Sequence, residues 1–163
     1  TLAADAVLGA LPSLAAGVAL RAELLLARRW AVAFDVALSP ERRDGAWSFG
    51  LTRFAAGECF RAHLHRRVEV APCAGVSFGL VHAVTFGPEP VEPGNYPWLA
   101  AHLEGRATAR VAGPVVAQLT VGGAWAPLRQ RFVTVGPTGA VARTVFEQSA
   151  FAGWGTAGLG VEW

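Results

Sequence analysis

Serine, histidine and glutamate side chains recur in the middle of the chain, and together they could carry out nucleophilic hydrolysis. In such a reaction a histidine takes the proton of a serine hydroxyl while a carboxylate orients the histidine. Neither candidate serine lies in a nucleophile motif such as GxSxG, and Ser77 in VSFG has only generic surroundings. We therefore expect no enzyme and no catalytic residues, and we interpret His63 and His102 as hydrogen-bonding partners. The full candidate set is Ser48, Ser77, His63, His82, His102, Glu69 and Glu104.

The two cysteines suggest a second kind of chemistry, a disulfide. If the chain forms a hairpin about Arg66, Cys59 and Cys73 lie directly across from each other on neighbouring strands, at a separation that a disulfide can bridge. An oxidising compartment would allow the bond to form, whereas two buried free thiols are the alternative interpretation. No CxxC or HxxH spacing is present, so we predict no metal site and no cofactor.

The composition limits the class of protein that these residues could serve. A chain of 163 residues suits one domain spanning 1–163, and 53% hydrophobic with 16% charged residues is rich in apolar side chains. No apolar run reaches the roughly 18 to 20 residues that a transmembrane helix needs, because arginines and acidic residues interrupt it. A net charge of +2 with scattered arginines gives no reason to expect a nucleic-acid partner. The apolar content must therefore fill a core or cover a lipid-facing surface.

Alternation of apolar and small or polar residues predicts strands along most of the chain. In Ser149–Trp163, Phe151, Leu159 and Val161 share one face, whereas Thr156 lies on the other. The same period of two predicts an all-β protein of about eight antiparallel strands. The other predicted strands are Leu2–Leu11, Ala15–Ala27, Trp30–Leu38, Trp47–Leu64, Val68–Leu80, Trp98–Ala112 and Val115–Trp125. A change of face near Thr52 and Arg53 predicts a β-bulge there.

The links between these strands alternate in length. Tight turns are predicted at Arg28–Arg29, His65–Arg67 and Gly113–Pro114. Longer loops are predicted at Ser39–Gly45, Phe86–Pro97 and Leu128–Gln148, whereas Pro12–Ser13 is short. Within the last loop, Phe132–Val135 and Ala140–Phe146 could form a hairpin extension about Gly136–Pro137.

This arrangement resembles the small outer-membrane β-barrels of Gram-negative bacteria, of the OmpA/OmpX size class. The last stretch, Gly155–Trp163, looks like the C-terminal strand by which the barrel-assembly machinery recognises such proteins. The resemblance implies an up-and-down transmembrane β-barrel in the outer membrane, in contact with its lipids and monomeric. It also implies a structural, anchoring or surface-interaction module, not an open pore. The chain is compatible with the C-terminal part of a longer protein, in which a periplasmic domain would come first.

The barrel interpretation assigns two sets of site residues. Eight strands enclose room for about one layer of side chains, so opposite charges on the inner face must pair. The predicted lumen charge network is Arg21, Glu23, Asp35, Arg61, His63, Glu69, His102, Glu104, Arg106 and Arg110. Tryptophans near strand ends predict an interfacial aromatic girdle of Trp30, Trp47, Trp98, Trp125 and Trp163.

Two alternatives stay open on the sequence alone. A soluble lipocalin-like barrel would turn its apolar face inward around an apolar small ligand, and period two does not say which face is inside. The membrane barrel is favoured because the less apolar face is mostly alanine, glycine and threonine, whereas a solvated exterior would be dense in charge. The second alternative is a lipid-modifying hydrolase of the outer membrane, with a serine, a histidine and an acid at the rim of the barrel.

Overall fold

The computed structural model describes residues 1–86, 94–136 and 139–162, and in this part of the chain the regular structure is β-strand. No helix in these ranges is long and apolar enough to cross a membrane. The strands are β1 (Leu2–Leu8), β2 (Ala15–Ala27), β3 (Trp30–Asp44), β4 (Trp47–Phe60), β5 (Ala62–His65), β6 (Val68–Thr85), β7 (Gly94–Ala112), β8 (Val115–Trp125), β9 (Arg131–Val135), β10 (Val141–Glu147) and β11 (Phe151–Val161).

The main sheet closes into an eight-stranded antiparallel barrel. Strands β1 to β4 pair in chain order, β4 pairs with β6, and β6, β7 and β8 again pair in chain order, while β11 pairs with both β8 and β1. Strand β5 continues the line of β4 after a break at Arg61 and pairs with β6, so β4 and β5 together form one of the eight barrel strands. Strands β9 and β10 form a separate hairpin. The predicted all-β, up-and-down barrel is confirmed.

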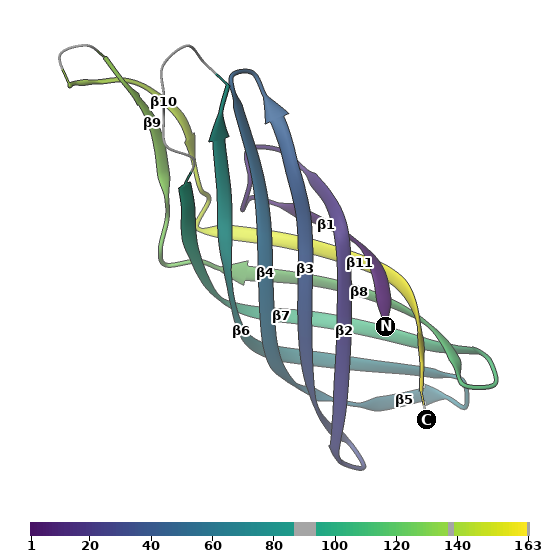
Figure 1. Cartoon of the computed structure of the whole chain (residues 1–163). Helices are drawn as coiled ribbons and strands as arrows, with labels where there is room; N and C mark the ends of the chain where they lie inside the picture. Colours follow the sequence, from purple (N-terminus) through teal and green to yellow (C-terminus); the bar gives the residue numbers. More distant parts are fainter. Residues whose placement is uncertain (87–93, 137–138, 163) are drawn as a thin grey trace.

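The two ends of the barrel differ (Figure 1). One end carries the tight turns Arg28–Arg29, Arg66–Arg67 and Gly113–Pro114 and lies near both chain termini, and we call it the turn end. The opposite end carries the β9–β10 hairpin and the segment between β1 and β2, and we call it the loop end.

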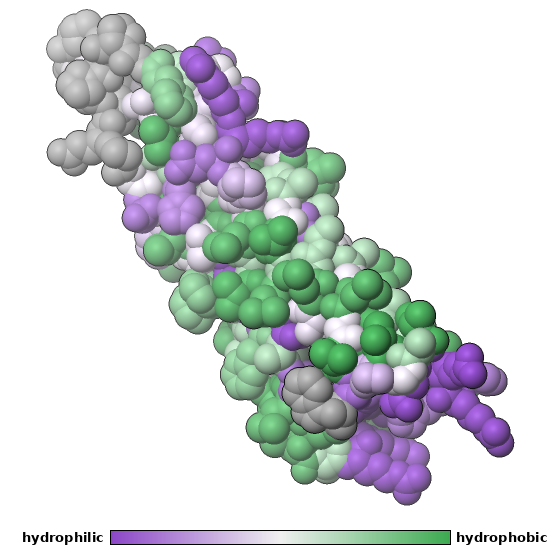
Figure 2. All heavy atoms as spheres, turned by 45° about the vertical axis from the view of Figure 1, so that its right-hand side comes forward, coloured by the Kyte–Doolittle hydropathy of each residue, from purple (hydrophilic) through white to green (hydrophobic). Residues whose placement is uncertain are grey.

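The apolar face of the barrel points outward. Phe34, Leu103 and Leu159 are 52%, 70% and 61% exposed, whereas Arg21 is 8% exposed inside. Figure 2 shows the result as a broad hydrophobic band with hydrophilic residues gathered towards the two ends. A soluble barrel with an apolar face turned inward is therefore not the structure of this chain, because the arginines and carboxylates occupy the interior.

Two local predictions about β3 and β4 are wrong. The predicted charged loop Ser39–Gly45 is mostly strand, because β3 continues to Asp44 and the turn is Gly45–Ala46. The predicted bulge at Thr52 and Arg53 is absent, since β4 pairs without a shift through both residues, and the register shift lies in β3 between Ser39 and Arg42. The apolar residues change face because Phe49 and Leu51 point into the barrel at the loop end.

The predicted loops Phe86–Pro97 and Leu128–Gln148 agree with the structure only in part. The predicted loop Phe86–Pro97 is shorter than expected, because β7 begins at Gly94, and residues 87–93 lie outside the described ranges. The hairpin expected within Leu128–Gln148 is present as β9 and β10. Gln148, which follows β10, donates from Nε2 to the carbonyl of Ala10 at 3.1 Å, which ties the base of this hairpin to the β1–β2 segment.

Candidate functional site

Arg21 on β2 is the centre of the charged interior. Its guanidinium donates to both carboxylate oxygens of Asp35 at 2.7 and 2.9 Å, to Glu104 at 2.7 Å and to the hydroxyl of Thr120 at 3.0 Å. Asp35 lies directly opposite Arg21 on β3, whereas Glu104 and Thr120 come from β7 and β8 across the lumen. One cation is thus shared by two carboxylates, and it joins opposite walls of the barrel.

Arg53 and Asp5 form a second buried pair nearer the loop end. Arg53 Nη2 lies 3.3 Å from Asp5 Oδ1, and the guanidinium carbon lies 4.5 Å from the centre of the Trp154 ring. Arg53 is absent from the predicted lumen network, because the bulge predicted at this position left the direction of its side chain undefined. An aromatic face beside the guanidinium supplies part of the stabilisation that a second carboxylate would give.

The charges continue to the turn end, where they line an open vestibule. Arg106 makes a bidentate ion pair with Glu23, in which Nη1 lies 2.6 Å from Oε2 and Nη2 lies 2.9 Å from Oε1. Glu23 and Arg21 both line a cavity of about 290 Å³ that extends towards the mouth. The network therefore runs from the middle of the barrel to its turn end.

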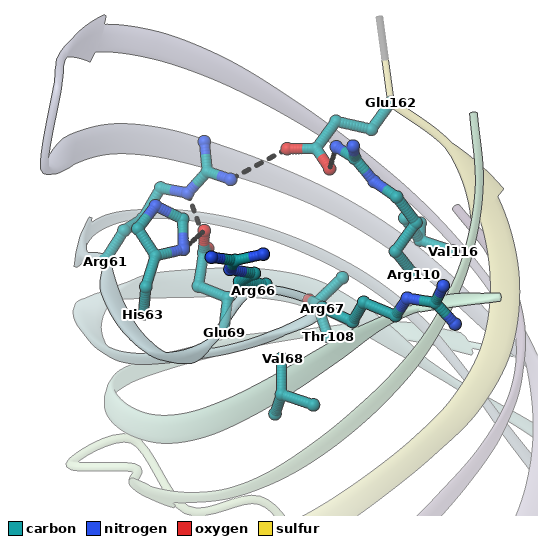
Figure 3. Close-up of a pocket in the computed structure, with 10 residues that line it drawn as sticks. All are labelled: Arg61, His63, Arg66, Arg67, Val68, Glu69, Thr108, Arg110, Val116 and Glu162. Carbon is teal, nitrogen blue, oxygen red and sulfur yellow. Dashed lines mark hydrogen bonds and ion pairs between the residues drawn. The ribbon is translucent and has the colours of Figure 1, made fainter. Parts of the chain in front are cut away.

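At the mouth, Arg61 joins Glu69 and Glu162 (Figure 3). Arg110 contacts the other oxygen of Glu162 at 3.2 Å, and His63 lies 3.4 Å from Glu69 with its ring largely exposed. The hydrogen bond from Arg61 to Glu69 raises the pKa of Arg61, and the hydrogen bond to Glu162 raises it further. Partial burial of the guanidinium has the opposite, smaller effect on this pKa. The hydrogen bond from Arg61 lowers the pKa of Glu162, with Arg110 adding to the effect and partial burial opposing it.

An apolar cluster fills the loop end of the lumen. Trp98 and Trp154 lie in it, 2% and 6% exposed, together with Phe49 and Val81. Phe132 from the β9–β10 hairpin packs edge-on against Phe49, with ring centres 5.2 Å apart. This cluster was not predicted, because the alternating pattern assigned the apolar residues to the outside of the barrel.

Cys59 and Cys73 form the predicted disulfide, which joins β4 to β6. They lie directly opposite each other in the register, and both are buried on the lumen side. Ala31, Ala33 and Ala71 pack around them. The bond is enclosed in the wall of the barrel, so its role in the described structure is to link strands.

The five tryptophans predicted for the girdle lie in different environments. Trp30 and Trp125 are exposed on the outside, Trp30 beside the turn end and Trp125 at the loop end. Trp98 is buried in the apolar cluster, so its girdle assignment is wrong, and Trp47 stacks on Phe49 beside the same cluster. Trp163 lies outside the described residues. Trp98 and Trp47 turn inward because the loop-end interior is apolar.

The structure brings together two pairs of the candidate hydrolase residues, Ser77 with His102 inside the barrel and His63 with Glu69 at the turn-end mouth. Ser77 Oγ lies 2.8 Å from His102 Nδ1, but Ser77 is fully buried inside the barrel. Within the described residues, no carboxylate hydrogen-bonds the other ring nitrogen of His102, whose ring meets Trp154 edge-on instead. In the described ranges, neither candidate serine hydrogen-bonds His63 or Glu69. The remaining candidates lie apart, with His82 bonded to Thr52 and Asn95, Ser48 buried on β4, and Glu104 in an ion pair with Arg21. The described residues also contain no cluster that could hold a metal ion.

Comparison with known proteins identifies the fold. No family model matches the sequence, and no curated protein matches it closely enough to count as a relative. Among solved structures, neisserial surface protein A is similar over 99% of this chain and 93% of its own, with a TM-score of 0.66 and 13% identity.

Two further solved structures give the same result. The attachment invasion locus protein Ail of Yersinia pestis, in complex with the heparin analogue sucrose octasulfate, matches over 98% of this chain and 92% of its own, with a TM-score of 0.60 and 10% identity. A major outer membrane protein of Thermus thermophilus matches over 97% of this chain and 98% of its own, with a TM-score of 0.61 and 16% identity. The chain therefore has the fold of the small eight-stranded outer-membrane β-barrels.

Proposed function

We propose that this protein is a non-conducting barrel of the outer membrane of a Gram-negative bacterium, which anchors or presents a contact surface at its loop end. The outward apolar band supports membrane embedding, because it would lie against acyl chains while the charged residues stay inside. Tight turns in such barrels face the periplasm and longer connections face the outside. The loop end with the β9–β10 hairpin would thus face the cell exterior.

The main support for this proposal is that side chains fill the lumen of the barrel. An ion that entered at the turn end would meet the paired charges around Arg21 and then the apolar cluster around Trp98. Passage would require either breaking buried ion pairs or entering an apolar region without its water shell, and both are costly. The role is therefore that of a rigid membrane-embedded support, with no catalytic step.

We also propose that the folded unit is a monomer and that β11 is the strand the assembly machinery recognises. In the described part of the chain, every strand of the main sheet except the short β5 has a strand partner on both sides, so closure of the barrel leaves no full-length strand edge for a second copy. Strand β11 presents Phe151, Leu159 and Val161 on its outward face, which suits recognition of an extended apolar strand.

Two measurements on the refolded protein test the proposal. Refolded into detergent or vesicles, the chain should migrate differently on a denaturing gel when unheated than after boiling, because a folded barrel resists the detergent. In planar bilayers the same sample should give no steady conductance. A soluble monomer without detergent would contradict embedding, whereas a steady open-channel current from the heat-modifiable form would contradict a closed lumen.

A further inference from the structure

Two tight turns at the turn end carry consecutive arginines, Arg28–Arg29 and Arg66–Arg67. All four side chains are exposed, and no hydrogen bond or ion pair joins their guanidinium groups to another residue in the described ranges. The loop end is different, because most of its arginines have hydrogen-bond partners. Arg42 donates to the carbonyl of Leu14, Arg43 to that of Gly45, Arg129 to Glu147 and Arg131 to Thr144. In the part of the chain that the structure describes, the guanidinium of Arg143 is the exception at this end. Unpaired cationic donors are thus concentrated at the turn end.

The first of these turns borders a pocket of about 260 Å³. Its lining comprises Arg28, Arg29, Phe60, Arg61, Ala62 and His63, so it includes no carboxylate. The backbone N–H of Arg61 donates to the carbonyl of Arg29 at 2.8 Å, which fixes the turn against the wall of the barrel. The Arg61 guanidinium is already bonded to Glu69 and Glu162, which leaves Arg28 and Arg29 as the available cationic donors.

The neighbouring pocket at the mouth makes a natural comparison (Figure 3). It is lined by Arg66 and Arg67, but Glu69 and Glu162 line it too. Negative charge from these two carboxylates would oppose an incoming anion. Of the two pockets, the one beside Arg28 and Arg29 is therefore the better fit for an anionic group.

The backbone around this pocket adds further capacity for hydrogen bonding. Trp30, the first residue of β3, lies opposite Phe60, so β5 extends beyond the end of β3 and pairs only with β6 in the described structure. Its other edge therefore carries backbone groups without a strand partner. The N–H groups on this edge, next to two arginines, can donate to the oxygens of a phosphate.

The outer surface next to the pocket is apolar. Phe60 lines the pocket and also contacts Trp30 edge-on, with ring centres 5.4 Å apart, and Trp30 is 49% exposed. A cationic pocket that borders exposed aromatic rings at the end of an apolar band has the polarity of a lipid headgroup boundary.

From this juxtaposition we propose that the pocket binds the phosphate of an anionic glycerophospholipid in the periplasmic leaflet. The phosphate contacts Arg28 and Arg29, and the acyl chains run along Phe60 and Trp30. This inference rests on the membrane embedding proposed above, which the gel assay tests independently. Arg66 and Arg67 serve as the matched comparison, since they carry the same charge at the same end of the barrel.

The test measures lipid selectivity of the folded barrel in phosphatidylcholine vesicles. Spin-labelled phosphatidylglycerol or spin-labelled phosphatidylcholine is added, and the relative association constant is obtained from the immobilised fraction in each spectrum. The wild type should prefer phosphatidylglycerol. In R28Q/R29Q, the ratio of the association constants of phosphatidylglycerol and phosphatidylcholine should fall about fivefold for each arginine that contacts the phosphate. R66Q/R67Q should keep it. The single variants R28Q and R29Q give the same information if the double variant fails the gel assay.

Each other outcome overturns the proposal. Equal losses in R28Q/R29Q and R66Q/R67Q would mean that general surface charge attracts the lipid and no site exists. No preference in a heat-modifiable wild type would remove the site while leaving the embedding proposal intact. If inorganic phosphate bound the refolded wild type and R28Q/R29Q abolished that binding, while the wild type showed no preference for phosphatidylglycerol, the pocket would take free phosphate and not a lipid headgroup.

Discussion

At the scale of single residues, Arg21 is the side chain on which most buried interactions depend. It is the shared partner of Asp35 and Glu104, and all three are enclosed in the lumen. Arg21→Leu should lower the free energy of unfolding by about 3–5 kcal/mol, because both carboxylates would lose their partner in a buried place. Urea unfolding of the refolded barrel, followed by tryptophan fluorescence, measures the change.

A surface arginine provides the control for this substitution. Arg129 pairs with Glu147 at 2.6 Å, but both side chains are nearly half exposed. Arg129→Leu should therefore change the unfolding free energy by no more than about 1 kcal/mol. Equal effects of the two substitutions would show that the Arg21 network does not hold the walls together.

Glu162 gives the barrel a pH dependence at its turn end. Since Arg61 and Arg110 lower the pKa of Glu162 below its ordinary value of 4.5, the carboxylate binds fewer protons in the folded than in the unfolded state near that pH. Its contribution to stability is thus fully present above pH 4.5 and is lost as the pH falls through the lowered pKa. Glu162→Gln should remove this contribution.

The measurement is the difference in unfolding free energy between wild type and Glu162→Gln, taken from neutral pH down to acid. The difference should be largest at neutral pH and shrink below pH 4.5. Taking a difference cancels the titration of the other carboxylates. A difference that stayed constant throughout this range would contradict the proposed link between Glu162 and Arg61.

The sequence could identify many of the charged residues but not their partners. Arg21, Asp35 and Glu104 were predicted to face inward because alternation along a regular strand assigns a face. The three-way contact depends on which strands lie opposite each other across the lumen, and that follows from barrel closure. Arg53 and Glu162 were missed in the predicted network, although both make ion pairs.

At the scale of strands, close packing inside the barrel depends on glycine at several positions, of which Gly122 on β8 is one. A Cβ atom at Gly122 on β8 would lie 2.6 Å from the ring of Trp154 on β11. Gly122→Ala should therefore displace Trp154, which also stacks against Arg53, and cost about 1–3 kcal/mol of unfolding free energy. Urea unfolding with Trp154 among the reporting fluorophores checks this.

Gly105 on the adjacent β7 is the matched control, because no atom of the described structure lies within 4 Å of the position its Cβ would take. Gly105→Ala should leave the unfolding free energy within about 0.5 kcal/mol of the wild type or raise it slightly. If both substitutions cost the same, the loss would come from the strand backbone and not from contact with Trp154.

Strand positions were more predictable than the ends of strands. Ala15–Ala27 was predicted as a strand and is β2 with the same bounds, because one face is continuously apolar and outward. The β3–β4 tip was predicted as a loop because charged residues follow Ser39, yet a projecting hairpin beyond the membrane can carry charge on both faces. A pattern that assumes one apolar face fails where both sides of a strand meet water.

At the scale of the whole molecule, the interior has three successive regions that the sequence could not separate. From the turn end these are the vestibule around Glu162, the ion pairs around Arg21 and the apolar cluster around Trp98. Alternation assigns a residue to the inside or outside, but its height along the barrel depends on the stagger between strands. The apolar cluster at the loop end thus became visible only in the closed barrel.

The ion pairs around Arg21 and the apolar cluster around Trp98 act as two barriers in series, which leads to a prediction about conductance. Arg21→Ala with Glu104→Ala removes side chains from the ion-pair region, but the apolar cluster still closes the loop end, so bilayers should show no steady current. Trp98→Ala with Trp154→Ala opens the cluster, but the ion pairs remain, so this variant should also be silent. All four substitutions together should give a steady current, because each barrier blocks by itself. The gel assay first establishes that each variant is folded. Current through either double variant would contradict the series arrangement, and silence of the folded quadruple variant would show that other side chains close the lumen.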